Sequence, residues 1–159
     1  MEGAVRPHPG IEVDKLKTDY REGLKKHLAD PQRPEFKQTS PAGQAQEAGD
    51  GYTRTFEADI IPGVLKIVVS AEIETGENWS VRLLVTATVF DKNVGQSDLR
   101  LSRYASWVEI HPGGLVAKAD LKIGIYGQHL CLTIEGQVCY WAFGWHCTQV
   151  DGRNLVCLA

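Results

Sequence analysis

The sequence predicts an all-β fold: about eight antiparallel strands in a meander, closed or nearly closed into a β-barrel and preceded by one N-terminal amphipathic helix. The hydrophobic period is three to four residues before residue 30 and two residues after residue 52. Several alternating segments exceed ten residues, and strands of this length must coil, which favours a barrel over a flat sheet. A two-sheet β-sandwich is the alternative.

Residues 1–29 are expected to form the helix. Its apolar side chains recur at three- and four-residue intervals, at Val13, Leu16, Tyr20, Leu24 and Leu28. The pair Asp30-Pro31 ends it, because a residue before proline disfavours the helical conformation. The apolar stripe is only one residue wide per turn. We therefore expect the helix to lie on the core or on a copy of itself, with a mobile lid as the alternative.

Residues 30–50 are expected to be a flexible linker to a β-barrel domain at 51–159. Phe36 is the only large apolar residue between Ala29 and Tyr52, and the segment is otherwise rich in proline, glycine, glutamine and small residues. Such a segment buries too little apolar surface to offset the entropy of ordering it.

Within the β domain, two segments alternate most clearly, Leu65–Glu74 and Trp79–Phe90, and Thr75–Asn78 between them predicts a hairpin turn. Glu135-Gly136 and Asp151-Gly152 are expected to be two further turns. The remaining strands are expected at Tyr52–Ile60, Leu99–Ile110, Leu115–Tyr126, His129–Ile134, Gln137–Val150 and Leu155–Leu158.

Charge composition argues against two classes of partner. The chain has 17 Lys+Arg and 20 Asp+Glu, a formal net charge of −3, which offers no basic field for a nucleic-acid backbone or an anionic membrane. No apolar run approaches roughly 18 residues, and the opening MEGAVRPHPG lacks the apolar core of a signal peptide. We expect a soluble, cytoplasmic protein with no nucleic-acid and no membrane partner.

The four cysteines, Cys131, Cys139, Cys147 and Cys157, lie in the last 29 residues with spacings unlike those of structural zinc sites. With turns at Glu135-Gly136 and Asp151-Gly152, each potential disulfide partner would be displaced by one strand position. We therefore expect free, buried thiols. A one-residue bulge in either hairpin would reverse this expectation.

The segment from Cys139 to Cys147 is the most distinctive in the chain. In a strand, Trp141, Phe143 and Trp145 share one face, and the opposite face is mostly small residues with Tyr140 and His146 near its ends. If the aromatic face points inward, it lines a pocket or fills the core. If it points outward, it needs a helix or a second subunit to cover it. Together with Trp107, these three aromatic residues are the candidate ligand-binding residues.

Four residues are candidates for proton transfer or substrate orientation: Tyr104, Glu109, Tyr140 and His146. Each lies in a segment rich in aromatic residues, where burial would perturb a pKa. Alternation also allows Glu109 and Trp107 to face outward together, and we favour that assignment.

The chain has no Gly-rich phosphate loop, nucleophile elbow, HExxH motif or Asp-rich calcium loop, so we expect no cofactor and no metal. We expect a small barrel that binds an apolar small molecule and, if it is an enzyme, acts as a cofactor-independent cyclase or isomerase. A helix-capped small barrel is broadly similar in architecture to the barrel cyclases of polyketide biosynthesis, including those that form spirotetronates by cycloaddition. That resemblance implies cyclisation directed by pocket shape and a few polar contacts.

Two alternatives come from other functional classes. The first is a non-catalytic β-sandwich that binds protein, or forms a homodimer, through the face of Trp141, Phe143 and Trp145. The second is a secreted, disulfide-bonded module, which a count of free thiols would distinguish from the other two.

Overall fold

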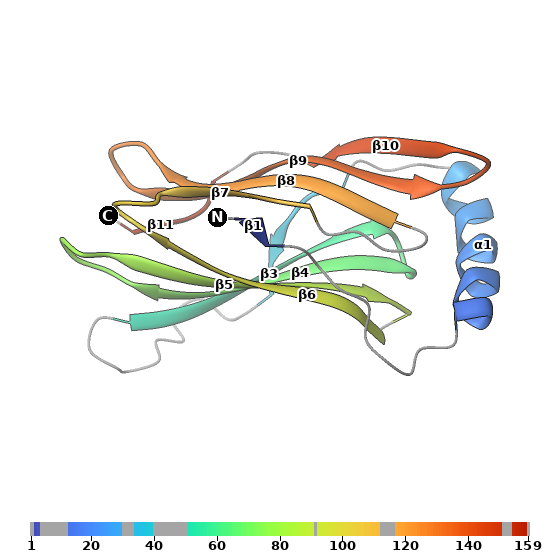
Figure 1. Ribbon diagram of the computed structural model, residues 1–159, viewed down its shortest axis with the longest axis horizontal. Coiled ribbons are helices and arrows are strands. Elements are labelled where there is room, and N and C mark those ends of the chain that lie inside the picture. The colour runs from blue at the N-terminus through green and yellow to red at the C-terminus, as the bar shows by residue number, and fades with distance from the viewer. Residues whose placement is uncertain are drawn as a thin grey trace.

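The computed structural model describes residues 2–3, 13–29, 34–39, 51–90, 92–111, 117–150 and 154–158. These residues form one helix and eleven strands, and the strands form two sheets that face each other (Figure 1). Within the described residues, no helix has both the length and the apolar run needed to cross a membrane.

The five-stranded sheet has the order β2-β3-β4-β5-β6 and is antiparallel throughout. The predicted hairpin at Thr75–Asn78 is confirmed, because Glu74 pairs with Ser80 across that turn. The strands are β2 (Lys37–Gln38), β3 (Gly51–Ile61), β4 (Leu65–Glu74), β5 (Ser80–Val89) and β6 (Lys92–Ser102).

The six-stranded sheet has the order β1-β7-β8-β9-β10, and β11 also pairs with β9. All its pairs are antiparallel except β1 with β7. β10 pairs with residues 136–141 of β9 and β11 with residues 131–133. The strands are β1 (Glu2–Gly3), β7 (Trp107–Ile110), β8 (Ala117–Tyr126), β9 (Cys131–Trp141), β10 (Trp145–Val150) and β11 (Asn154–Cys157).

One hydrophobic core lies between the sheets and takes alternate residues from each strand. In β4 and β5 the buried positions include Val69, Ile73 and Leu83, and in β8 and β9 they include Ile123 and Ile134. The alternation seen in the sequence therefore marks the inner faces of both sheets.

The predicted closed barrel is not found. The strand pairing among the described residues gives two sheets, as the sandwich alternative expects. Leu99–Ile110, expected as one strand, is broken by a turn at residues 103–106, where Ser102 and Ala105 exchange two backbone hydrogen bonds. This turn carries the chain from β6 in one sheet to β7 in the other.

The helix α1 (Val13–Ala29) confirms the one helix that the sequence predicts near the N-terminus, but the predicted range of 1–29 is wrong at residues 2–3, which form β1. The helix lies across one end of the two sheets (Figure 1). Tyr20 and Leu24 are buried in the common core. Gly23 lies against the turn between β3 and β4, where a Cβ atom would overlap the Val64 side chain. A glycine at this position allows the helix to approach the sheet closely.

The segment expected to be a linker contributes to the β domain. Residues 37–38 form β2 on the edge of β3, and Phe36 is buried in the core. The other residues of the predicted linker, 30–33 and 40–50, lie outside the described residues.

The turn predicted at Glu135-Gly136 is wrong, because β9 runs straight through it. Gly136 has a φ of 144°, and a Cβ atom there would overlap the backbone carbonyl of Asp120 in β8. This glycine therefore allows two strands to approach closely and does not reverse the chain. The reversal falls instead at residues 142–144, between β9 and β10.

The shifted turn changes the cysteine pairing. In the observed register, Cys139 lies directly opposite Cys147 and Cys131 directly opposite Cys157, and both pairs form disulfides. The expectation of free thiols is therefore corrected. A register shift between Asn154 and Val156 in β11 brings Cys157 opposite Cys131.

Candidate functional site

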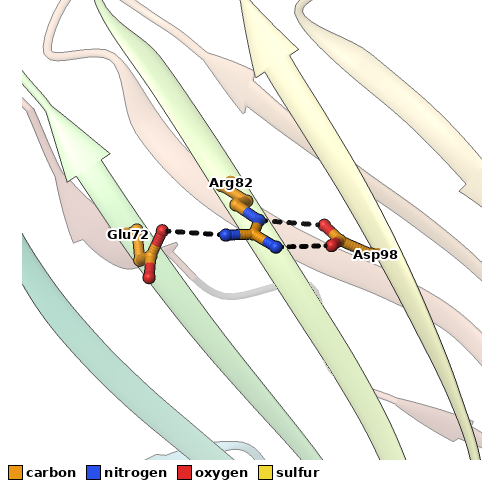
Figure 2. A network of polar contacts seen from close by, with 3 residues as sticks. All are labelled: Glu72, Arg82 and Asp98. Carbon is orange, nitrogen blue, oxygen red and sulfur yellow. Dashed lines mark hydrogen bonds and ion pairs between the residues drawn. The ribbon is translucent and has the colours of Figure 1, made fainter.

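The outer faces of the two sheets differ in character. On the five-stranded sheet, Arg82 of β5 lies between carboxylates on both neighbouring strands (Figure 2). Its Nη2 and Nε donate to the two carboxylate oxygens of Asp98, at 2.7 and 3.2 Å, and its Nη1 lies 3.7 Å from Glu72. The hydrogen bonds from Arg82 lower the pKa of Asp98. These groups are exposed, as on an ordinary solvated surface.

The outer face of the six-stranded sheet carries aromatic and lysine side chains. Lys122 of β8 lies over the Trp107 ring, with Nζ 4.8 Å from the ring centroid, and 5.8 Å from the Tyr126 ring. Lys118, four residues earlier on the same face of β8, places Nζ 4.4 Å from the Trp145 ring. Each pair has cation–π geometry, which keeps an aromatic ring ordered in contact with water.

Three aromatic residues at the end of the β9–β10 hairpin, Trp141, Phe143 and Trp145, form a projection that we call the aromatic tip. Trp141 pairs with Trp145 across the hairpin, and their rings meet edge to face with centroids 5.6 Å apart. The two indoles remain 49% and 41% exposed, and Phe143 at the turn is fully exposed.

Several contacts fix the conformation of the aromatic tip. The Ala142 N–H donates to the Gly144 carbonyl at 2.8 Å, and Phe143 between them adopts a φ of 59°. His146 Nε2 lies 2.9 Å from the Ala142 carbonyl and therefore donates to it. The Cys139–Cys147 disulfide joins the two strands behind the indoles. The fully exposed phenyl ring is thus held on an ordered hairpin.

A second cluster lies on the inner side of the same hairpin, beneath α1. Tyr140 of β9 stacks on His146 of β10, with centroids 5.6 Å apart, and meets His27 of α1 edge to face at 5.3 Å. The cluster joins the helix to the six-stranded sheet, and the core residue Tyr20 of α1 lies close enough to Tyr140 to interact with it. We call Tyr20, His27, Tyr140 and His146 the helix-base cluster.

Two polar atoms of the helix-base cluster are buried without a hydrogen-bond partner among the described residues, the Tyr20 hydroxyl and His27 Nδ1. Burial raises the pKa of Tyr20 above its ordinary value, and the neighbouring Tyr140 adds to this shift. Burial lowers the pKa of His27. Both groups are therefore neutral at neutral pH.

The four candidate catalytic residues do not form one centre. Tyr140 and His146 are brought together in the helix-base cluster. Tyr104 lies in the turn between β6 and β7 and is 85% exposed. Glu109 points outward from β7, opposite Lys122 of β8, in phase with Trp107 as favoured from the sequence.

The four candidate ligand-binding residues all lie on the outside of the molecule. Trp107, Trp141, Phe143 and Trp145 are exposed, whereas the inward positions of the same strands hold Val108, Ile110, Val138 and Tyr140. These four aromatic residues therefore do not line a space between the sheets. They are available to a partner in solution.

Sequence reasoning missed several members of both groups. His27 is not one of the regularly spaced apolar residues of α1, and its seven-residue distance from Tyr20 is the signal that places both on one helix face. Lys118 and Lys122 alternate as on any solvated strand, and only the pairing of β8 with β7 and β9 brings the aromatic rings beside them.

No group of three or more potential metal ligands occurs in the part of the chain that the structure describes. Comparisons with protein-family models, with curated proteins and with solved structures found no match to the chain. The case for function therefore rests on the geometry of the aromatic tip and the helix-base cluster.

Proposed function

We propose that the protein is a non-catalytic binding module whose contact surface is the aromatic tip. The observation that supports this most directly is the fully exposed Phe143 between two half-exposed indoles. Exposed aromatic residues that gather in one place are typical of interaction sites, whereas single apolar residues on a surface need no explanation.

The contrast between the two outer faces supports the same proposal. On the face around Arg82, the guanidinium is paired with the carboxylates of Glu72 and Asp98. Of the seven exposed aromatic side chains among the described residues, five lie on the six-stranded sheet or at its β9–β10 turn, and the other two, Phe90 and Tyr104, lie at turns that flank β6. Such concentration on one side is expected of a surface that becomes covered by a partner.

The order of the aromatic tip favours binding as well. A disulfide, a backbone hydrogen bond and the His146–Ala142 hydrogen bond hold the hairpin before any partner arrives. A contact surface that is already ordered loses less conformational entropy on binding.

The proposal is tested with the Phe143→Ser variant against a matched control, Tyr104→Ser, which removes an exposed aromatic ring in the turn between the sheets. Both proteins and the wild type are compared for self-association by sedimentation equilibrium and for binding to immobilised polysaccharides and lipid vesicles. We expect at least one of these activities to fall about tenfold with Phe143→Ser and to persist with Tyr104→Ser, because burying a phenyl ring contributes this much to association. No difference between the two variants in any assay would contradict the proposal.

A second candidate function is binding of a small molecule at the helix-base cluster, with cyclase or isomerase activity as its catalytic form. The observation that favours it is the unpaired Tyr20 hydroxyl and His27 Nδ1, two polar atoms that a ligand with hydrogen-bonding groups would satisfy. Titrating polyketide-like phenols while following the imidazole signals of His27 and His146 by NMR tests it. Unchanged signals across such a set would argue against this function.

A further inference from the structure

We propose that the partner of the aromatic tip is an anionic phospholipid bilayer, into whose interface Phe143 inserts. This inference rests on the proposed function above and names the partner.

The side chains follow the polarity gradient of a bilayer interface. Phe143, wholly apolar, is at the turn, and the indoles of Trp141 and Trp145 come next along the strands. Behind them, Lys118 extends over the Trp145 ring, with Nζ 4.4 Å from its centroid. In a bilayer, Phe143 would meet the acyl chains and the indoles would meet the carbonyl region, because indoles favour the interface. Lys118 would extend to the phosphates.

Charge near the aromatic tip differs in sign from charge on the whole chain. The chain has a formal net charge of −3, but residues 136–150 contain no aspartate, glutamate, lysine or arginine, so the charge near the aromatic tip comes from neighbouring elements. The contact between His27 and Tyr140 brings the last turns of α1, with exposed Lys25 and Lys26, to the same end of the molecule (Figure 1). Each basic residue near an anionic bilayer strengthens binding severalfold.

The acidic groups of this sheet face lie farther along the strands. Asp120 is opposite Gln137, which lies four residues before Trp141 on β9. Asp120 Oδ1 lies 2.8 Å from His111 Nδ1, within hydrogen-bond and ion-pair distance. Glu109 and Glu135 face Lys122 on the two strands beside it. On α1, Glu22 precedes the two lysines by one turn. Glu22 is therefore a helix neighbour of Lys25 and Lys26, and together with Lys118 these lysines outnumber it at the end that carries the aromatic tip.

The exposed aromatic surface is small for a protein partner. Three aromatic side chains, two of them about half exposed, present on the order of 500 Å² at most. A stable protein–protein interface needs about 800 Å² from each partner. A bilayer surrounds a projecting hairpin and needs no complementary surface of its own.

The geometry also disfavours a flat sugar-binding surface. The two indoles meet edge to face, with an interplanar angle of 76°, so they do not form one plane. Lys118 already covers a face of the Trp145 ring. A sugar ring that stacks on an aromatic residue requires an open face, whereas insertion into a bilayer does not.

The test uses the full chain and two kinds of unilamellar vesicle, pure phosphatidylcholine and phosphatidylcholine with phosphatidylserine at about one lipid in four. Sedimentation with the vesicles measures binding, and the tryptophan emission reports transfer of the indoles from water. We expect binding to the anionic vesicles, a blue shift of the emission, and a loss of about tenfold or more in Phe143→Ser. Tyr104→Ser is the control and should bind as the wild type does.

A second pair of variants separates charge from insertion. Lys25→Ala together with Lys26→Ala should weaken binding to the anionic vesicles by about tenfold or more, and raised salt should abolish that difference. An exposed control on the distant face, Arg100→Ala, should have little effect. Near-ultraviolet circular dichroism of each variant confirms that it is folded.

The outcomes are distinguishable. Equal binding of the wild type and Phe143→Ser to anionic vesicles, or no binding by either, would overturn the lipid proposal. If self-association or polysaccharide binding then depends on Phe143, the aromatic tip remains a contact surface with another partner. If none of the assays depends on Phe143, both the lipid proposal and the binding-module proposal fail.

Discussion

At the scale of single residues, Tyr20 combines two opposing contributions to the free energy of unfolding. Its ring is fully buried in the core and contributes apolar contact, but its hydroxyl is buried with no partner among the described residues. A hydroxyl in that position has lost its hydrogen bonds to water without replacing them.

We therefore predict that Tyr20→Phe stabilises the protein. Removing the unpaired hydroxyl while keeping the ring should raise the free energy of unfolding by about 1 kcal/mol. Urea denaturation measures the change, and Tyr104→Phe, at an exposed position, should leave stability within about 0.5 kcal/mol of the wild type. A loss of stability in Tyr20→Phe would reveal that the hydroxyl has a bonding partner after all.

His27 gives the same cluster a dependence on pH. Burial lowers its pKa, so the unfolded chain binds a proton more readily than the folded protein does. Stability is therefore complete above the ordinary histidine pKa of about 6.5 and falls as the pH decreases from there toward the lowered pKa, by at most about 1.4 kcal/mol per pH unit. The Tyr140 ring meets His27 edge to face, and Tyr140 in turn stacks on His146.

The measurement is urea denaturation at several pH values between neutrality and mild acid. The decrease should be smaller in His27→Gln, which cannot be protonated, and should persist in His146→Gln. If His27→Gln and the wild type lose stability in parallel, His27 is not the group responsible.

At the scale of elements, β9 pairs with two later strands on one edge, and a disulfide joins it to each. Cys139–Cys147 encloses a sequence separation of 8 residues and Cys131–Cys157 one of 26. A longer enclosed loop loses more entropy in the unfolded chain when it is closed, so the second bond should contribute more.

We predict that replacing both cysteines of a disulfide with serine destabilises the protein more for Cys131–Cys157 than for Cys139–Cys147. Cys139→Ser with Cys147→Ser should lower the free energy of unfolding by about 2–3 kcal/mol, and Cys131→Ser with Cys157→Ser by about 1 kcal/mol more. Denaturant unfolding measures both, and the wild type in denaturant without reductant should show no free thiol. Four free thiols in protein recovered from an oxidising medium would contradict the pairing.

The aromatic tip and the cysteine pairs are two features that the sequence could not predict fully. Alternation placed Trp141 and Trp145 on one face of a single strand, but the turn at residues 142–144 puts them opposite each other on β9 and β10. Alternation also cannot decide which face of a strand is inward, because that depends on what the opposite sheet supplies. The cysteine pairing failed through one residue, Gly136. Its role is a close approach to Asp120, sixteen residues earlier, and no local pattern reveals such a contact.

At the scale of the whole molecule, the sequence predicted the helix, the strand-rich domain and the β4–β5 hairpin, because each depends on local periodicity. It did not predict that the strands separate into two sheets. The turn at residues 103–106 interrupts a continuous run of alternating residues, so only the pairing of Ser102 with Ala105 marks it. The sequence identified only some residues around the aromatic tip and in the helix-base cluster. Lys118 and His27 were missed because they join these groups through tertiary contacts.

Net charge and the distribution of charge lead to different expectations about a membrane partner. A sum over the chain treats all charges as equivalent, but the fold gathers acidic groups into pairs such as Asp98 with Arg82 and leaves Lys25 and Lys26 exposed at one end. What a partner experiences is the charge of the surface it approaches. The expectation of no membrane partner followed from the sum, and the lipid proposal follows from the distribution.

The two disulfides on β9 give the protein an unusual response to force. If the molecule is stretched between its two ends, tension passes from Cys131 to Cys157 through sulfur, and the 26-residue separation between them carries no load. At roughly 3.5 Å per residue, about 90 Å of chain stays hidden from extension until a reductant is added. The hairpin that carries Phe143 lies wholly within this shielded length, so no tension acts on it while the rest of the fold is pulled apart.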